Sequence, residues 1–304
     1  MSGSTPRSID EYLAALRAAL ADEDPALVQD ALYDAEEYLR AEVAANPGMP
    51  EADVLERVAG RYGRPDEIAA AYRDTEVKVT RAFQPPASIR PASHSPLKQF
   101  LSVYSDPRAY MSLFFMFLSL ITGIVYFTFA VTGISLSIGL AILIIGLPVF
   151  LAFIAITRAI SLAEGRLLEA VSGERMPRRP VHPGPNVGLW ERIVATVQDT
   201  PTWTTLVYLV MMLPLGTIYF VAATTAFSLG VSLLLLPIAG IAQRLDWWLP
   251  WGDERLLFSP RWLDTPAGWV FCVVFGAFLL TSLLHVARMV VGLHARVAKG
   301  LLVT

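Results

Sequence analysis

The chain has 304 residues, of which 54% are hydrophobic and 17% are charged. An ordinary soluble domain is about a quarter charged, so this composition excludes a chain built only from soluble domains. The net charge of −3 is divided unevenly, because residues 1–76 carry 7 Lys and Arg against 17 Asp and Glu, whereas residues 77–304 carry 17 against 10.

The residue content also excludes several functions. The acidic first part lacks the basic surface that phosphate recognition needs, so we expect no direct binding of nucleic acid. Cys272 is the single cysteine, which excludes a disulfide or a CxxC motif within one chain. The histidines are scattered, and no HExxH, GxSxG or Gly-rich phosphate loop occurs. We therefore expect no catalytic, cofactor-binding or metal-binding residues, no cofactor, and a protein that is not an enzyme.

Residues 8–81 carry apolar residues at helical spacing in four short segments. The first residues of the chain lack the apolar run of a cleavable signal peptide, so we expect this part to stay in the cytoplasm. The pattern predicts an acidic, cytoplasmic four-helix domain over residues 1–82. Its start and stop signals are Ser8 with Glu11, Asp24 with Pro25, and Gly63 with Pro65.

The second of these helices carries acidic residues on the face opposite its apolar stripe. Two interpretations fit such a face: a solvated surface, or a docking site for a basic cytoplasmic regulator protein. The candidate partner-binding residues are Asp30, Asp34, Glu37 and Glu42.

Residues 83–105 connect this domain to the rest of the chain. Several prolines among Ser and Ala predict a stiff, extended tether. The apolar residues that follow at helical spacing predict a short helix along the membrane surface, and they are Leu97, Phe100, Leu101 and Tyr104.

Four apolar runs are long enough to cross a hydrocarbon core, which takes about 20 helical residues. Ser228–Ala242 is apolar but short and contains Pro237, so we interpret it as re-entrant or interfacial, with a spanning role left open. The four runs hold no Asp, Glu or Lys, which argues against an ion-coupled carrier. The runs are Met111–Thr132, Leu136–Thr157, Thr204–Ala226 and Gly268–Val290.

The basic residues predict the orientation. Lys and Arg dominate the segments before the first run, between the second and third runs, and after the last run. Between the third and fourth runs, acidic residues outnumber basic ones. We therefore expect the N- and C-termini to be cytoplasmic.

The membrane part contains an internal repeat. After a shift of 93 residues, eleven of the 35 positions from Asp106 to Leu140 meet the same residue type. We predict two parallel hairpins, residues 106–173 and 199–304, in a membrane domain over 106–304. Transporters use such repeats, but the duplication of a stable hairpin gives the same pattern. Further on, a shift of 130 pairs Arg158 with Arg288 and Arg166 with Arg296, so the second repeat holds 37 additional residues, mostly in Ile241–Ala267.

Two further groups of residues are candidates for contact with the membrane. The tryptophans of the Ile241–Ala267 region and its border fit an aromatic belt, or a surface that senses an amphiphile at the outer interface; they are Trp247, Trp248, Trp251, Trp262 and Trp269. The repeated arginines are candidates for contact with lipid headgroups; they are Arg158, Arg166, Arg288 and Arg296.

Several motifs resemble known bacterial families. The first 76 residues resemble the HAAS signalling domain, above all in Gly63-Arg64-Pro65-Asp66-Glu67-Ile68-Ala69 and in the acidic stretch Tyr33–Leu39. Residues 106–300 resemble a sensor membrane domain of bacterial signalling proteins, in Leu120–Phe127, Ser135–Gly139 and Leu162–Leu168. The resemblance implies signal transduction across the bacterial cytoplasmic membrane, often beside PadR-type transcription regulators, and it supplies no catalytic residue.

The sequence thus predicts an all-α protein, with a cytoplasmic four-helix domain and a polytopic membrane domain of two repeated hairpins. The leading function is a non-enzymatic membrane sensor or signalling scaffold that couples envelope state to a cytoplasmic partner. The alternative is a lipid- or small-molecule-handling membrane protein, such as a permease subunit or an immunity factor. The expected partners are membrane lipids and a basic regulator, and a homo-oligomer is left open.

Overall fold

The protein is described from a computed structural model, which covers residues 6–83, 95–143, 146–177, 179, 194, 196–245 and 265–302. Over these residues the chain is helical and contains no strand, so the predicted all-α class is confirmed. The chain divides into two compact units. Unit 1 comprises residues 1–92, 134–206 and 297–304, and unit 2 comprises residues 93–133 and 207–296.

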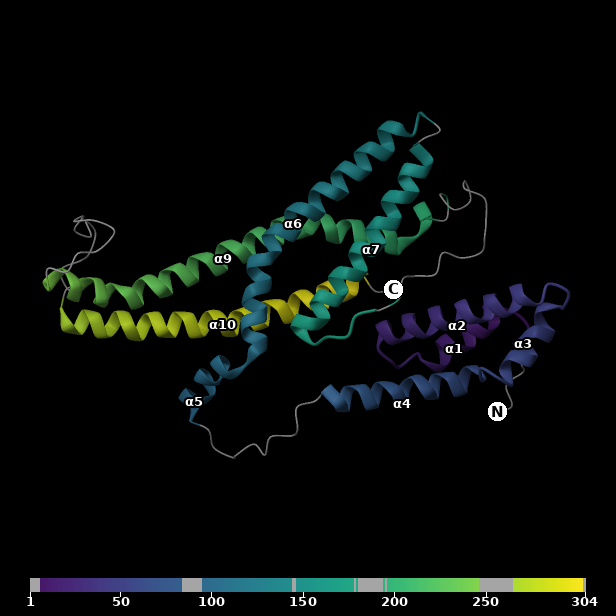
Figure 1. Ribbon diagram of the computed structural model, residues 1–304, viewed down its shortest axis with the longest axis horizontal. Helices are drawn as coiled ribbons and strands as arrows, with labels where there is room; N and C mark the ends of the chain where they lie inside the picture. The colour runs from purple at the N-terminus through teal and green to yellow at the C-terminus, as the bar shows by residue number, and fades with distance from the viewer. Residues whose placement is uncertain are drawn as a thin grey trace. The chain divides into compact units, whose positions relative to one another are not determined.

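The N-terminal part of unit 1 contains four helices: α1 (Ile9–Ala19), α2 (Pro25–Ala45), α3 (Glu51–Ala59) and α4 (Pro65–Phe83). α1 packs against α2 and α4, and α2 packs against α3 (Figure 1). Their apolar stripes form one core with residues of the adjoining turns, and all the described residues of this core lie between Ile9 and Tyr72, so the domain has a hydrophobic interior of its own. The most buried large side chains of this core are Tyr12, Leu16, Leu20, Leu27, Leu39 and Leu55.

Local signals account for where these helices begin. Ser8 accepts a hydrogen bond from the backbone N–H of Glu11, and Asp24 accepts one from Ala26. Both side chains satisfy backbone donors that have no partner inside the helix. Gly63 before α4 has φ of 114°, which favours glycine, and its carbonyl accepts a hydrogen bond of 2.8 Å from the Tyr12 hydroxyl. The Gly63–Ala69 motif therefore begins with a turn that is hydrogen-bonded to α1.

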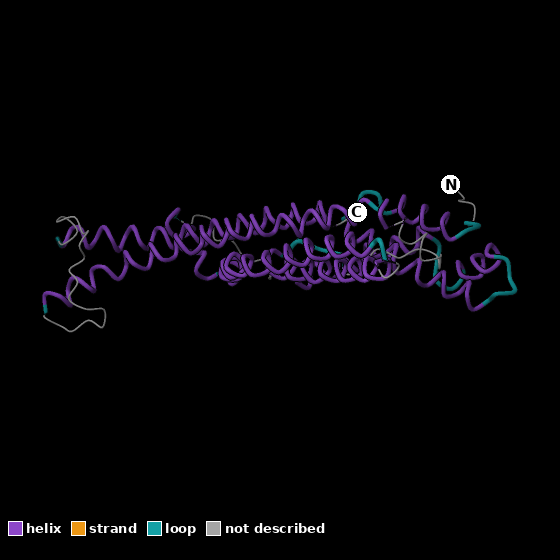
Figure 2. Tube along the Cα trace, turned by 90° about the horizontal axis from the view of Figure 1, so that it is seen from above, coloured by secondary structure: helices purple, strands orange, loops and turns teal. Residues whose placement is uncertain are grey.

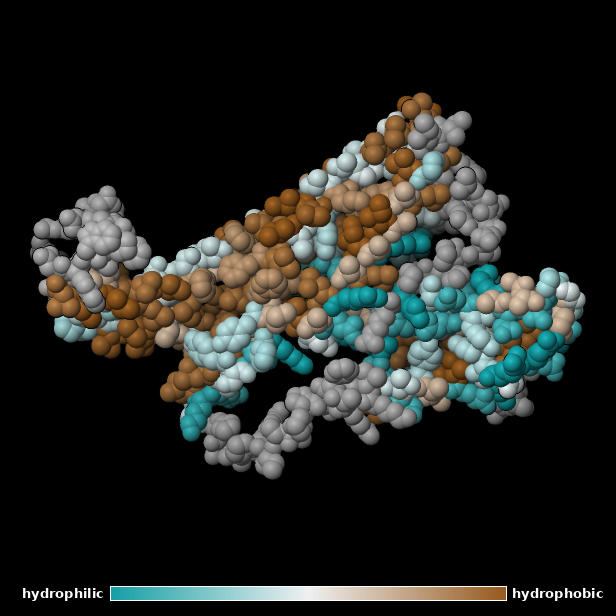
Figure 3. Space-filling model, viewed as in Figure 1, coloured by the Kyte–Doolittle hydropathy of each residue, from teal (hydrophilic) through white to brown (hydrophobic). Residues whose placement is uncertain are grey.

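The membrane part follows a short helix, α5 (Pro96–Leu101), and a 3₁₀ turn, Ser102–Ser105. Its long helices are α6 (Pro107–Leu140), α7 (Gly146–Ser172), α9 (Thr200–Arg244) and α10 (Pro266–Leu302). All four are long and apolar enough to cross a membrane. Their outward side chains are apolar, as Figure 3 shows over α9 and α10, while α2 and α4 are covered mainly by hydrophilic residues.

Two predicted boundaries in the membrane part are wrong. The predicted run Leu136–Thr157 straddles the turn between α6 and α7, because residues 136–145 are apolar on both sides of the turn and hydropathy does not locate it. The interpretation of Ser228–Ala242 as a re-entrant piece is also wrong, since α9 continues through it to Arg244. Pro214 and Pro237 both lie inside α9, where a long apolar helix tolerates the loss of a backbone hydrogen bond.

In unit 2, α6 and α9 approach each other at two glycines that the repeat matches. A Cβ on Gly123 would lie 2.5 Å from the carbonyl oxygen of Met212, and a Cβ on Gly216 would lie 2.1 Å from that of Ser119. The shift of 93 residues relates Gly123 to Gly216 and Ser119 to Met212. The contact is therefore reciprocal, as expected for two repeats related by a two-fold axis.

The turn end of the second hairpin is longer than that of the first. α9 has 45 residues against 34 in α6, and α10 has 37 against 27 in α7. α9 and α10 run side by side over this extension (Figure 2), with Gly230 against Leu280 and Gly240 against Trp269. The additional residues of the second repeat thus lengthen both helices as well as the loop between them. Trp247, Trp248, Trp251 and Trp262 lie outside the described residues, and Trp269 is half-buried.

Candidate functional site

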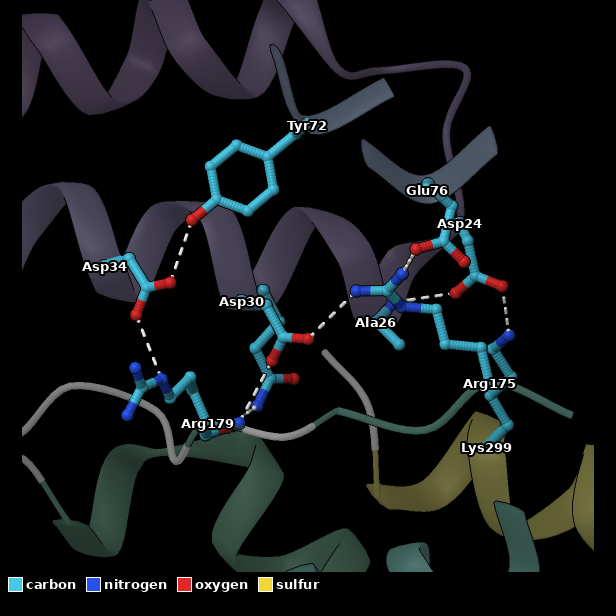
Figure 4. A network of polar contacts seen from close by, with 10 residues as sticks. Asp24, Ala26, Asp30, Asp34, Tyr72, Glu76, Arg175, Arg179 and Lys299 are labelled. Atoms are coloured by element: carbon cyan, nitrogen blue, oxygen red, sulfur yellow. Dashed lines mark hydrogen bonds and ion pairs between the residues drawn. The ribbon is translucent and has the colours of Figure 1, made fainter. Parts of the chain in front are cut away.

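Within unit 1, the acidic face of α2 contacts two segments from the membrane part of the chain. One segment follows α7, and the other is the end of α10. We call these contacts the docking network (Figure 4). Its acidic members are Asp24, Asp30, Asp34 and Glu76, and its basic members are Arg175, Arg179 and Lys299.

Arg175 lies at the most buried point of the docking network. Its guanidinium pairs with Asp30 at 3.2 Å and also with Glu76 of α4. The Arg175 side chain is 16% exposed and that of Asp30 is 8% exposed. An ion pair so far removed from water is costly to break, because removing one partner leaves the other charge buried without compensation.

The same face of α2 also holds the main chain at Arg179. The second carboxylate oxygen of Asp30 accepts a hydrogen bond of 3.0 Å from the Arg179 backbone N–H. The side-chain amide of Gln29 donates one of 2.9 Å to the Arg179 backbone carbonyl. Two neighbouring residues of one helix thus satisfy both backbone polar groups of Arg179, which fixes the position of this residue along α2.

The Arg179 side chain extends the docking network along α2. Its guanidinium pairs with Asp34 at 3.0 Å and lies over the ring of Tyr33, 5.7 Å from the ring centre. The Tyr72 hydroxyl of α4 donates a 2.8 Å hydrogen bond to the other oxygen of Asp34. Burial, and then this hydrogen bond, raise the pKa of Tyr72 above its ordinary value, so the phenol stays neutral and remains a donor.

The N-terminal end of α2 contacts the second repeat. Lys299, in the last turns of α10, lies 2.5 Å from a carboxylate oxygen of Asp24. The other oxygen of Asp24 caps α2 through the Ala26 N–H. α2 therefore touches the chain after the first hairpin and also the end of the second.

Of the predicted partner-binding residues, Asp30 and Asp34 belong to the docking network. Glu37 is exposed, and Glu42 is half-buried with its carbonyl accepting a hydrogen bond from Asn46. Sequence reasoning missed the role of Arg175 and Arg179, which it counted among the basic residues that predict the orientation of the membrane helices. The available signal was the opposite charge of the two segments, but charge alone does not identify which basic segment binds.

The open ends of the two hairpins, where the first helix of each begins and the second ends, are joined by a reciprocal pair of ion pairs. Arg158 of α7 lies 3.4 Å from Asp199, and Arg288 of α10 lies 3.1 Å from Asp106. The repeat matches the two arginines with each other and the two aspartates with each other. Each arginine thus pairs with the aspartate of the other repeat.

Arg158 and Arg288 are therefore partnered within the protein, whereas Arg166 and Arg296, also matched by the repeat, are exposed. Contact of these four arginines with lipid headgroups stays a prediction.

Two further titratable residues occupy matched positions in α7 and α10. Glu164 is 1% exposed and His294 is 2% exposed, and the shift of 130 residues relates them. His294 contacts the hydroxyls of Tyr208 at 3.0 Å and Tyr219 at 3.3 Å. The second membrane-spanning helix runs from Gly146 to Ser172 and therefore contains Glu164. The expectation that the spans contain no carboxylate does not hold for this helix. Buried ionisable groups in such helices are candidates for function.

A pocket in unit 1 lies beside the docking network. Its lining includes Gln29 of α2, Arg158 and Ser161 of α7, Met176 after α7, Thr202 of α9, and Leu302 of α10. Among the residues that the structure describes, no three His, Cys, Asp or Glu side chains gather in a way that would hold a metal ion. The pocket offers a mixed polar and apolar wall where these segments meet.

Two family models match the chain. The model described as Putative sensor matches residues 115–302, and the model described as HAAS matches residues 11–71. The first runs from within α6 to the end of α10, and the second runs from within α1 to within α4. No curated protein and no solved structure matches the chain. The predicted resemblance of the two parts of the chain is therefore confirmed.

Proposed function

The chain belongs to the Putative sensor family, and from this premise we propose that it couples the state of the bacterial envelope to a cytoplasmic partner such as a transcription regulator. At the coarser level it is a multi-pass membrane protein of signalling type, with a sensor domain and a HAAS domain. In the proposed function it is not an enzyme. It lies in the cytoplasmic membrane with both termini inside, in keeping with the distribution of basic residues.

The docking network is the observation that carries this proposal. A signal that reaches the membrane helices needs a physical path to the HAAS domain, and the path must have two arrangements that the signal biases. Asp30 and Asp34 of α2 bind Arg175 and Arg179 after the first hairpin, and Asp24 binds Lys299 at the end of the second. A change in either hairpin therefore acts directly on α2.

The experiment compares cells that carry the wild-type protein with cells that carry Arg175→Gln/Arg179→Gln at the same abundance. Both substitutions remove the charges that bind α2 and leave the apolar helices unchanged. We expect a defined set of transcripts to change in the variant even without an envelope stress. Glu37→Gln is the matched control, since Glu37 is exposed on the same helix, and it should leave transcripts as in the wild type. Identical transcripts in all three strains, with and without stress, would contradict the proposed function.

A second candidate function is the handling of a lipid or small molecule. The observations that favour it are the pocket that contains Arg158 and Ser161, and the buried carboxyl group of Glu164. Purification followed by mass spectrometry of bound lipids separates the two candidates. A specific lipid that is lost in Ser161→Leu, with no change in transcripts, would favour this candidate over signalling.

A further inference from the structure

We propose that the face of α2 and α4 formed by Gln29, Asp30, Asp34 and Glu76 is a peptide-binding surface for a segment with two arginines four residues apart. Residues 175–177 and 179 are its built-in occupant, and a partner protein with a segment of the same chemistry displaces them. This inference rests on the proposed signalling function, because it names the chemistry by which the partner is recognised.

The first argument is that the surface distinguishes two side-chain positions. Asp30 and Glu76 converge on Arg175, while Asp34 and the ring of Tyr33 hold Arg179. Acidic groups from two helices and an aromatic face suit guanidinium groups better than ammonium groups, because guanidinium is planar and offers several donors in a fixed geometry. The surface therefore specifies arginine at both positions, and the spacing follows from the residues of α2 that bind them.

The second argument is that the surface also binds the main chain. Asp30 accepts the backbone N–H of Arg179, and Gln29 donates to its carbonyl oxygen. These hydrogen bonds do not depend on the identity of the bound residue, so they serve any segment that places its main chain at the same point. A cluster of acidic residues on a solvated face does not provide such contacts.

The third argument is that the built-in segment does not satisfy the surface fully. Within the described part of the chain, Gln29 Oε1 and Arg175 Nε are buried and have no hydrogen-bond partner. Buried polar atoms without partners are unfavourable, so a segment that offers a donor to Gln29 Oε1 binds better than the present occupant. The outer contact is also weakly held, since the Arg179 side chain is 51% exposed and that of Asp34 is 34% exposed. Both features make the occupant replaceable.

The test uses the full-length protein in nanodiscs of phosphatidylcholine, whose neutral lipid does not attract a basic peptide. The probe is a fluorescent nine-residue peptide with the sequence of residues 172–180, and binding is followed by fluorescence anisotropy. In the wild type, the tethered segment competes at the high effective concentration of a linked ligand. We expect Arg175→Gln/Arg179→Gln, which empties the surface, to bind the probe at least about tenfold more tightly than the wild type.

Three controls make the result specific. Adding Asp30→Asn and Asp34→Asn to the emptied protein should abolish binding. An isomeric peptide, in which the arginine of position 175 is exchanged with the methionine of position 176, has no two arginines four residues apart. It should bind much more weakly although its charge is the same. Arg179→Gln alone changes a half-exposed side chain and is therefore a control for misfolding of the double variant. Its affinity for the probe should lie between those of the wild type and the double variant.

The proposal is overturned if the emptied protein binds the probe no better than the wild type, or if the isomeric peptide binds equally well. Transcripts that respond to Arg175→Gln/Arg179→Gln together with either of these binding results would reject the peptide surface while leaving the signalling function intact. The two proposals therefore fail separately.

Discussion

In the first hairpin, α6 ends at Leu140 and α7 begins at Gly146, whereas in the second hairpin 21 residues separate Arg244 from Pro266. The open ends of the same hairpins are alike, since Arg158 and Arg288 make reciprocal ion pairs with Asp199 and Asp106. The repeat is thus preserved where the hairpins join each other and altered at the turn. The open ends also carry the contacts with α2, through Arg175 after α7 and Lys299 near the end of α10, whereas the additional residues of the second repeat lie at its turn end.

We expect the largest loss of stability from a substitution at the crossing of α6 and α9, where the two repeats contact each other. A Cβ at Gly216 would lie 2.1 Å from a backbone oxygen, so Gly216→Ala should force the helices apart at a cost of about 1–3 kcal/mol or more. Gly123→Ala should behave alike, because the contact is reciprocal. Thermal unfolding followed by size-exclusion chromatography measures the loss.

Gly292→Ala is the control, since nothing lies within 4 Å of a Cβ at Gly292 and alanine favours a helix over glycine by about 1 kcal/mol. Equal stability of Gly216→Ala and Gly292→Ala would contradict the reciprocal crossing.

The next effect concerns the buried ion pair of the docking network. Asp30→Asn removes a charge that is 8% exposed and paired with Arg175, and breaking such a pair costs about 3–5 kcal/mol. The released domain should lose the contact of Asp24 with Lys299, which a zero-length carbodiimide cross-linker captures in the docked protein. We expect the cross-linked fraction, measured by mass spectrometry, to fall several-fold. Glu37→Gln should leave it unchanged, and a similar fall in that variant would show that charge alone sets the yield.

A smaller effect is expected from the ion pairs at the open ends, because all four side chains are partly exposed. Arg158→Gln and Arg288→Gln should each destabilise the protein by about 0.2–1 kcal/mol. The two variants should be equivalent, and exchanging the charges in Arg288→Asp with Asp106→Arg should restore part of the loss. A loss confined to one of the two arginines would break the symmetry between the hairpins.

The smallest effect is a pH dependence in the HAAS domain. Burial, followed by a hydrogen bond to Asp34, raises the pKa of Tyr72, and burial raises the pKa of Tyr12. A raised pKa in the folded state favours the neutral phenol, so this stabilisation is complete below the unfolded value of about 10 and is lost as the pH rises through the folded value. The thermal midpoint of residues 1–82 should therefore fall as the pH rises above about 10. Tyr72→Phe should reduce the slope, and an unchanged slope would exclude Tyr72 as its source.

Sequence reasoning succeeded where the signal is local. Ser8, Asp24 and Gly63 mark the helix ends of the HAAS domain because capping and positive φ depend on only a few neighbouring residues. The two glycines that the repeat matches, Gly123 and Gly216, each lie against the backbone of the other helix where α6 and α9 cross.

Sequence reasoning failed where local signals are uniform, or where two residues in contact lie far apart in the sequence. Residues 136–145 are apolar on both sides of the turn, so neither charge nor hydropathy locates it. Asp30 and Arg175 are 145 residues apart, and nothing in the composition of α2 shows that its acidic face binds a segment of the same chain. The position of Glu164 inside a membrane-spanning helix was missed because the uniformly apolar residues 136–145 do not show where α7 begins.

The most direct test of the account is the distance between the HAAS domain and α7 in the full-length protein. Spin labels at Glu37→Cys and Arg166→Cys, both exposed positions in unit 1, are introduced into a Cys272→Ala background and measured by pulsed electron paramagnetic resonance in nanodiscs. The account predicts one narrow distribution in the otherwise wild-type protein, and a broad, longer distribution after Arg175→Gln/Arg179→Gln. The same distribution in both proteins, or a broad one in both, would contradict the claim that these arginines hold the HAAS domain to the membrane part.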